Sequence, residues 1–163
     1  MEQFVESGFA KDVAIKLINS VLLLKSEKTS FSTLDICSVD LYSGRAEFIK
    51  IGAASAFVIR DGEVRGIQSS SLPVGILESV DVEKSEMSLK DGDIILMASD
   101  GVMDVLDPGC DEEDWVREKF QSLNSMNPQD IADYFLIEAR KKAGEPIRDD
   151  MTVLAARIWE RYQ

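Results

Sequence analysis

Short segments with the pattern of β-strands follow one another from residue 34 to residue 98, and this succession constrains the fold most strongly. Residues 34–41 alternate apolar and polar side chains, which indicates a strand with one buried face. Asp61-Gly62 is a strong signal for a two-residue hairpin between two such segments. Four consecutive segments, at residues 34–41, 46–51, 56–60 and 63–67, therefore predict an antiparallel meander. Two further strand segments follow at residues 82–89 and 94–98.

Helical patterns flank these strand segments. Residues 10–25 carry apolar side chains at the spacing of one helix face, so we expect an amphipathic helix there. The acidic residues 111–114 favour the start of a second helix, and Pro128 suits the first turn of a third, which Gly144 ends. Residues 151–158 supply a last strand. This order of elements predicts an α+β chain with mostly antiparallel sheet.

The composition limits the classes of function. The chain has 163 residues, of which 45% are hydrophobic, enough for one domain with a packed core. Its formal net charge is -12, which argues against binding nucleic acid through phosphates or docking on an anionic membrane. It has no histidine, which excludes Ser-His-Asp and Cys-His catalysis and most zinc sites. Hydrolysis would then depend on carboxylates, lysine or arginine, a hydroxyl group or a metal-activated water.

Cysteine usage and hydropathy bear on the compartment. Cys37 and Cys110 are two isolated cysteines, which do not make a disulfide framework. No segment resembles a signal peptide, and no apolar run reaches the length of a membrane span. These features favour a reduced, cytoplasmic setting for the domain.

Two short acidic sequences stand next to strand segments in the C-terminal half. Residues 99–101, Ser-Asp-Gly, follow the apolar segment 94–98, and residues 149–150, Asp-Asp, precede the last strand. If these two ends meet in space, several carboxylate oxygens converge at the rim of a β-rich core. Carboxylate and water oxygens are the ligands that Mg²⁺ and Mn²⁺ prefer. The pair therefore predicts a cation site.

Each acidic sequence also has an ordinary interpretation. A Ser-Asp-Gly sequence is common in polar turns that begin a helix, and the aspartate pair could be a solvated loop pair neutralised by Arg148. In the same way, residues 52–55, Gly-Ala-Ala-Ser, form a turn of small residues that needs no function. The two acidic sequences carry more weight together than apart, because each is attached to a core strand.

Longer motifs around the acidic sequences resemble a known family. Residues 89–102 closely resemble the penultimate metal motif of the PPM (PP2C-like) serine/threonine protein phosphatases, and residues 149–153 look like their final motif. Residues 72–76, Leu-Pro-Val-Gly-Ile, match a further landmark of the family. Residues 15–22 and 32–35 look most like the phosphatase domain of stage II sporulation protein E. The resemblance covers essentially the whole chain, with its motifs in the family order.

The resemblance implies a fold and a set of site residues. The fold would be a PP2C-like sandwich of two mostly antiparallel β-sheets flanked by α-helices. Asp100 and Asp149 would be direct ligands of a pair of Mn²⁺ or Mg²⁺ ions, with Gly101 beside them at the metal site. Asp104 matches a position that helps hold an additional, weaker metal in some members. Asp150 aligns with a position often filled by asparagine, so an orienting role is implied. Beyond metal-bound water, no catalytic group is expected.

The chain departs from the family pattern at its start. The family carries an Asp-Gly-x-Gly sequence near the start of the domain, and its aspartate bridges both metals. This sequence has no such motif ahead of the helix predicted within residues 1–25. One interpretation is a fragment, with residues 1–163 forming the C-terminal portion of a single PP2C-like domain whose first strands are missing. The other is a naturally shortened, inactive relative. We favour the fragment because the remaining motifs are intact, and we expect it to be impaired or inactive without the bridging ligand.

The function implied by the resemblance is hydrolysis of phosphoserine or phosphothreonine on a regulatory protein. Analogy with sporulation protein E suggests an anti-sigma-factor antagonist as the substrate, in sporulation control. A rival is a catalytically inactive pseudo-phosphatase that acts as a regulatory interaction module, and a third reading is a general acidic domain that binds divalent cations. The expected partners are a phosphorylated regulatory protein and a second copy in a homodimer, but no nucleic acid. The parent protein could be membrane-anchored, as the resembled protein is.

Overall fold

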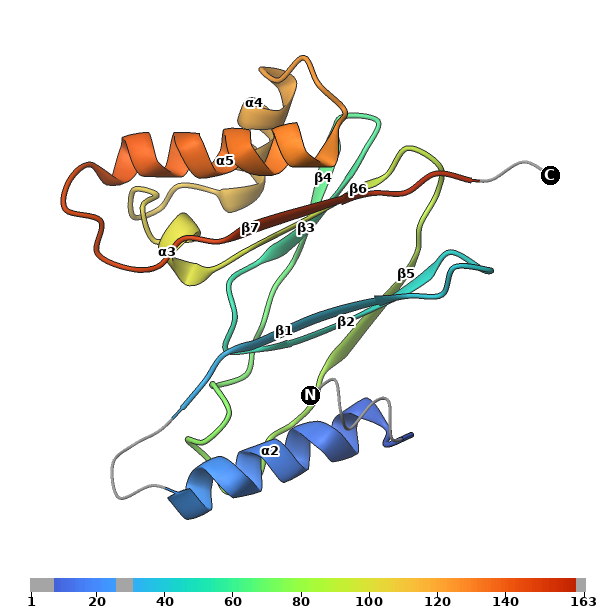
Figure 1. Cartoon of the computed structure of the whole chain (residues 1–163), viewed down its shortest axis with the longest axis vertical. Helices are drawn as coiled ribbons and strands as arrows, with labels where there is room; N and C mark the ends of the chain where they lie inside the picture. Colours follow the sequence, from blue (N-terminus) through green and yellow to red (C-terminus); the bar gives the residue numbers. More distant parts are fainter. Residues whose placement is uncertain (1–7, 26–30, 161–163) are drawn as a thin grey trace. The chain divides into compact units, whose positions relative to one another are not determined.

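The chain folds into two compact units, each with its own β-sheet, in a computed structural model that describes residues 8–25 and 31–160. Figure 1 shows the order of the elements along the chain. The first unit contains the helix at the N-terminal end and one sheet, and the second contains the other sheet and the later helices. The second unit is built from residues 41–45, 54–68 and 88 onward, and the first from the rest.

The first unit holds a three-stranded sheet in the order β1-β2-β5. β1 (Leu34–Val39) pairs antiparallel with β2 (Arg45–Ile51), and β5 (Lys84–Ser88) is the other neighbour of β2. The helix α2 (Lys11–Lys25) confirms the amphipathic helix predicted at residues 10–25. Its buried Ile15 packs in a core cluster with Val74 and with two residues of β2, Ile49 and Ile51.

Asn19 of α2 attaches the helix to the connection after residue 72. Its side chain is 2% exposed, its Oδ1 accepts the Gly75 backbone N–H at 2.7 Å, and its Nδ2 donates to the Leu77 carbonyl at 2.9 Å. Val74 is fully buried and exchanges backbone hydrogen bonds with Ser32. The Leu-Pro-Val-Gly-Ile sequence is thus a packed connection within the first unit.

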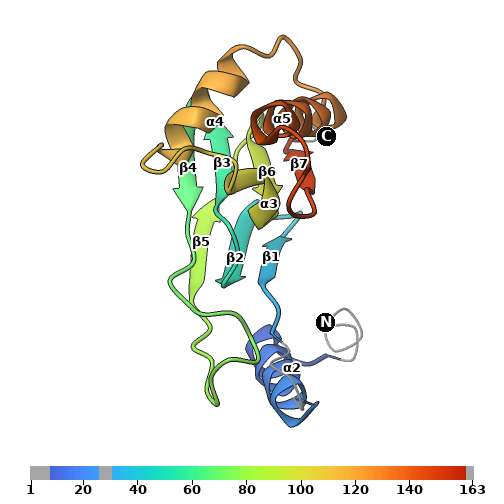
Figure 2. The same cartoon turned by 90° about the vertical axis from the view of Figure 1, so that its left-hand side faces the viewer.

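The second unit holds a four-stranded antiparallel sheet in the order β4-β3-β6-β7, visible side by side in Figure 2. β3 and β4 form the hairpin predicted at Asp61-Gly62, and both turn residues have positive φ, 52° and 82°. Such a turn requires this backbone conformation, which glycine and aspartate tolerate. The strands are β3 (Ala56–Arg60), β4 (Glu63–Ile67), β6 (Ile94–Ala98) and β7 (Val153–Arg157).

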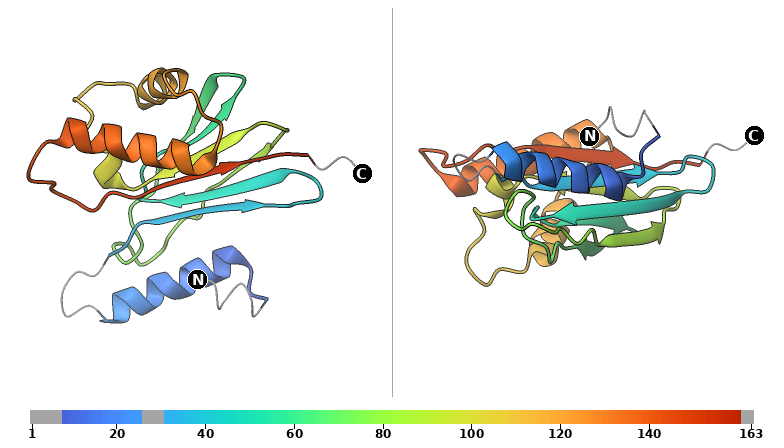
Figure 3. Two further views of the ribbon diagram at one scale, coloured as in Figure 1. Left: turned by 45° about the horizontal axis from the view of Figure 1, so that its top comes forward. Right: turned by 90° about the horizontal axis from the view of Figure 1, so that it is seen from below.

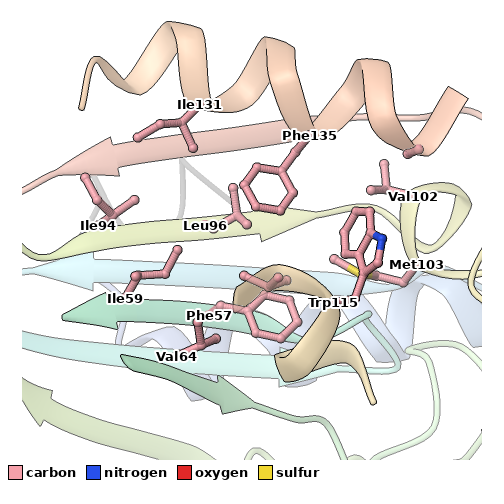
Figure 4. Packing of buried hydrophobic residues seen from close by; sticks show 12 residues of the cluster. Phe57, Ile59, Val64, Ile94, Leu96, Val102, Met103, Trp115, Ile131 and Phe135 are labelled. Atoms are coloured by element: carbon pink, nitrogen blue, oxygen red, sulfur yellow. The ribbon is translucent and has the colours of Figure 1, made fainter. Parts of the chain in front are cut away.

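Helices pack against this sheet and enclose its core. They are α3 (Asp100–Met103), α4 (Glu112–Gln121) and α5 (Pro128–Ala143), and α5 lies along β7 (Figure 3). Phe135 and Ile131 of α5 face the sheet beside Leu96 of β6, as Figure 4 shows. Trp115 of α4 meets Phe135 edge to face, with ring centroids 5.5 Å apart. No helix in the described ranges combines the length and apolarity that a membrane crossing requires.

The predicted meander of four consecutive strands is wrong. β2 pairs within the first sheet, whereas β3 pairs with β4 and β6 in the second. The chain leaves the first sheet at Gly52, which has a φ of 62° and donates its N–H to the Ser71 carbonyl and the Ser69 hydroxyl, both at 3.0 Å. A Cβ at Gly52 would lie 2.6 Å from Pro73, so this turn needs glycine. The predicted α+β class with two antiparallel sheets and flanking helices is confirmed.

Candidate active site

The two acidic sequences meet at the end of the β6-β7 ladder. Ala98 pairs with Val153, and beyond them the Ser99 N–H donates to the Thr152 carbonyl at 3.0 Å. The Thr152 N–H donates in return to the Ser99 hydroxyl oxygen at 2.9 Å. That hydroxyl also donates to the Asp150 carbonyl at 3.0 Å. One serine therefore joins the sequence that follows β6 to the sequence that precedes β7.

Gly101 brings the two sequences into backbone contact. It is buried in the first turn of α3, and a Cβ there would lie 2.5 Å from the Asp150 carbonyl oxygen. Real side chains do not tolerate such a distance, so this approach is open to glycine alone. The prediction that a glycine after Asp100 permits a close backbone approach is confirmed.

Asp100 is the first residue of α3 and is half-buried. Its Oδ1 accepts the Ala54 backbone N–H at 3.0 Å, which holds one carboxylate oxygen in place. Ala54 belongs to the small-residue turn that the sequence reading left without a function. The sequence signal for this turn was a run of small residues between two strand segments. Such a run does not indicate which acceptor the Ala54 N–H will bind.

The same turn is held from its other side by α4. The Ser55 hydroxyl donates to a carboxylate oxygen of Glu112, and Ser55 is 8% exposed. The neighbouring Glu113 accepts the Gly66 N–H of β4 at 2.9 Å. The first turn of α4 thus binds the small-residue turn through Ser55, next to Ala54, and the sheet through Gly66. Sequence reasoning assigned the acids at 111–114 to helix initiation and missed these contacts.

The remaining predicted residues lie at the same end of the sheet. Asp149 and Asp104 line a recess together with Gly101. Asp104 follows α3, where its N–H donates to the Asp100 carbonyl at 2.8 Å, and its side chain is exposed. Asp150 is exposed and donates its N–H to Asp149 Oδ1 at 2.7 Å, while its carbonyl meets Ser99. The structure thus gathers the predicted residues in one region.

The type of ligand atom at this site, carboxylate oxygen, suits a hard divalent cation. Asp100 and Asp149 offer carboxylate oxygens, which Mg²⁺ and Mn²⁺ prefer, and Mg²⁺ usually keeps several water ligands. Among residues 8–25 and 31–160, no group of three or more His, Cys, Asp or Glu side chains is gathered closely enough to hold an ion. The described residues therefore provide part of a ligand set, and the assignment of individual ligands stays a prediction.

Comparison with known proteins identifies the family. Residues 1–159 match the family described as Stage II sporulation protein E (SpoIIE). The chain belongs to this family. It is 37% identical over 158 residues to stage II sporulation protein E of Bacillus subtilis (strain 168), an alignment that covers 97% of the chain. The same alignment spans 19% of the length of that SpoIIE protein.

Solved SpoIIE structures share the fold. The PP2C phosphatase domain of Bacillus subtilis SpoIIE, solved with a fragment of its regulatory domain, superposes with a TM-score of 0.84 at 37% identity. That superposition covers 97% of this chain and 48% of the other. The Mn-presoaked phosphatase domain of the same protein gives a TM-score of 0.72 at 36% identity, covering 99% of this chain and 71% of the other. The chain thus has the fold of a PP2C-type SpoIIE phosphatase domain.

Proposed function

We propose that this chain is part of a metal-dependent phosphatase that hydrolyses phosphoserine or phosphothreonine on a regulatory protein. The observation that carries the proposal is the junction of the two acidic sequences through Ser99 and Gly101, in a chain of the SpoIIE family. This junction puts Asp100 and Asp149 on two segments that are joined by one backbone hydrogen bond and two hydrogen bonds of the Ser99 hydroxyl.

Asp100 and Asp149 would hold Mn²⁺ or Mg²⁺, two ions in the intact domain. When bound, such ions neutralise phosphoryl oxygens and activate water for attack on phosphorus. The chain's own contribution is positioning. The Ala54 N–H orients the Asp100 carboxylate, and Ser99 holds the segment that carries Asp149. The Asp100 carboxylate is thus oriented directly, and the Asp149 carboxylate only through its segment.

The relatives support the proposed substrate class by analogy. The similar proteins are described as SpoIIE, a cell-fate determinant with a PP2C phosphatase domain. By analogy the substrate here would be a phosphorylated anti-sigma-factor antagonist, and a homodimer remains part of the proposal. The chain spans less than a third of the length of the curated SpoIIE proteins it matches, so these partners are inferred for the protein that contains it.

A catalytically inactive regulatory module is the second candidate. It is favoured by the absence of a group of three metal-ligating side chains within the part of the chain that the structure describes. Such a module would keep the fold and bind a phosphoprotein without hydrolysing it.

The test uses the full-length protein with Mn²⁺ and a phosphoserine protein as substrate. Asp100→Asn and Asp149→Asn should each lower the rate of phosphate release by ~100-fold or more, because each removes a charged oxygen ligand. Asp133→Asn, at an exposed position on α5, is the matched control and should keep normal turnover. Near-normal turnover in either site variant would refute the site, and no turnover in the wild-type protein would favour the inactive module.

A further inference from the structure

A recess of about 400 Å³ opens in the second unit beside the proposed ligands. Asp104, Asp149 and Gly101 form one part of its lining, and two cations, Lys142 and Arg148, form another. Its volume lies in the range of pockets that hold small ligands or a few side chains. The other lining residues are apolar: Val105, Ala143, Pro146 and Met151.

Lys142 and Arg148 differ in whether a carboxylate pairs with their charge. Lys142, in the last turn of α5, places its Nζ 2.6 Å from Asp107 Oδ2, so its charge is already paired. Arg148 is exposed and, within the described residues, has neither a hydrogen bond nor an ion pair. Its guanidinium is therefore free for an anionic ligand, which it can bind with two parallel hydrogen bonds.

In the part of the chain that the structure describes, Arg148 does not form ion pairs that would neutralise the neighbouring aspartates. Asp149 and Asp150 follow it directly in the sequence, yet neither forms an ion pair with it in the described residues. Asp149 Oδ1 instead accepts the Asp150 N–H at 2.7 Å. Arg148 therefore places a positive charge, without a carboxylate partner among the described residues, in the recess next to the proposed metal ligands.

We propose that this recess is a substrate subsite, in which Arg148 binds an anionic oxygen group of the phosphorylated protein. The proposal rests on the proposed phosphatase function. The ligand chemistry is a phosphate or carboxylate oxygen pair, supplied by the phosphoserine itself or by an acidic residue beside it. The apolar part of the lining, including Val105 and Met151, would contact the aliphatic portion of the same peptide.

The test compares Arg148→Gln with Arg65→Gln in the full-length protein. Arg65 is an exposed arginine on β4 outside the recess, so it controls for the loss of one positive charge. The substrates are p-nitrophenyl phosphate and two phosphoserine peptides, one with glutamate and one with alanine next to the phosphoserine. Steady-state kinetics separate KM from kcat for each substrate.

If Arg148 binds the acidic neighbour, Arg148→Gln should raise KM about 10-fold for the glutamate peptide alone, as loss of a charge-assisted bond would. If it binds the phosphoryl group, kcat/KM should fall for all three substrates. Either pattern supports the subsite, and Arg148→Lys should restore part of the loss. Kinetic constants equal to those of Arg65→Gln on every substrate would overturn it.

A binding measurement separates this proposal from the proposed function. Fluorescence anisotropy with the labelled glutamate phosphopeptide, in the absence of divalent metal, needs no turnover. Weaker binding by Arg148→Gln than by Arg65→Gln would support the subsite even if the protein hydrolysed no substrate. Equal binding by the two variants would overturn the subsite even if Asp100→Asn abolished phosphate release.

Discussion

Ser99 and Thr152 exchange two hydrogen bonds, from the Ser99 N–H to the Thr152 carbonyl at 3.0 Å and from the Thr152 N–H to the Ser99 hydroxyl at 2.9 Å. The pair extends the β6-β7 ladder by a side-chain bond where the strands end. Ser99 precedes α3, yet its side chain makes no capping bond to the helix. Its hydroxyl instead connects the two acidic sequences.

Ser99→Ala should loosen the segment that carries Asp149. The variant loses the acceptor for the Thr152 N–H and the donor to the Asp150 carbonyl, and the cost should be about 1 kcal/mol in the free energy of unfolding. Urea denaturation measures this cost, and Mn²⁺ titration should show weaker binding. Ser99→Thr keeps the hydroxyl and should behave like the wild type. Equal Mn²⁺ affinity in the alanine variant would contradict the connecting role.

Gly101→Ala should displace the loop before β7. The added Cβ would lie 2.5 Å from the Asp150 carbonyl oxygen, which is backbone and must move. We expect a loss of ~1–3 kcal/mol in unfolding free energy, together with weaker Mn²⁺ binding. Gly66→Ala is the control, because its Cβ would meet the flexible side chain of Glu113. A smaller stability loss at Gly101 than at Gly66 would be inconsistent with the contact.

Glu112→Ala should release the turn that holds Asp100. It removes the acceptor of the largely buried Ser55 hydroxyl, at a cost of ~1–3 kcal/mol. Glu112→Gln keeps an acceptor oxygen and should recover most of the stability. Thermal unfolding compares the two variants. If they are equally stable, the Ser55 bond does not hold the turn.

Asp93 should make stability depend on acid pH. Its side chain is 1% exposed, and burial acts to raise its pKa. Hydrogen bonds from Arg60 Nε at 2.8 Å and the Lys90 N–H at 2.8 Å outweigh burial and hold the pKa below its ordinary value. A lowered folded-state pKa gives stability that is present above the unfolded-state pKa and is lost as the pH falls through the folded value.

Urea unfolding of the wild type should therefore show this loss below about pH 4. Asp93→Asn should be less stable at pH 7 and show a shallower decline in acid. The exposed Asp133→Asn serves as the control and should follow the wild-type curve. Parallel curves for wild type and Asp93→Asn would show that this carboxylate contributes nothing to the acid transition.

The two cysteines should react with iodoacetamide at different rates. Burial, followed by the charge of Asp35, raises the pKa of Cys37 to about 11, against the opposing effect of Lys11. At pH 8 roughly 0.1% of such a thiol is ionised, and the thiolate is the reactive form. Cys110 is exposed, so it should be labelled first. Mass spectrometry of Cys110→Ser should show slow labelling that becomes fast in urea, and rapid labelling of the folded variant would contradict the burial of Cys37.

Local patterns were enough to predict most of the elements, but not the short helix α3. The helical spacing at residues 10–25 and the Asp61-Gly62 turn each depend on neighbouring residues, and both appear in the structure as predicted. The α+β class followed from the order of such patterns. The placement of Asp100 and Asp149 next to strand ends could also be read from the chain, because apolar segments directly adjoin them.

Partner choice depended on tertiary structure. The Asp61-Gly62 turn indicates that Ala56–Arg60 (β3) is a strand that pairs with β4, but not that its other neighbour is β6 rather than β2. Likewise, no local pattern indicates that the Ala54 N–H will meet Asp100, 46 residues away, or that Ser99 will bind Thr152. The sequence by itself determined most of the elements and which side chains offer oxygen ligands, since these depend on short-range sterics and hydropathy. The tertiary structure alone decided which of those elements meet, because pairing between distant segments depends on the packing of the whole unit.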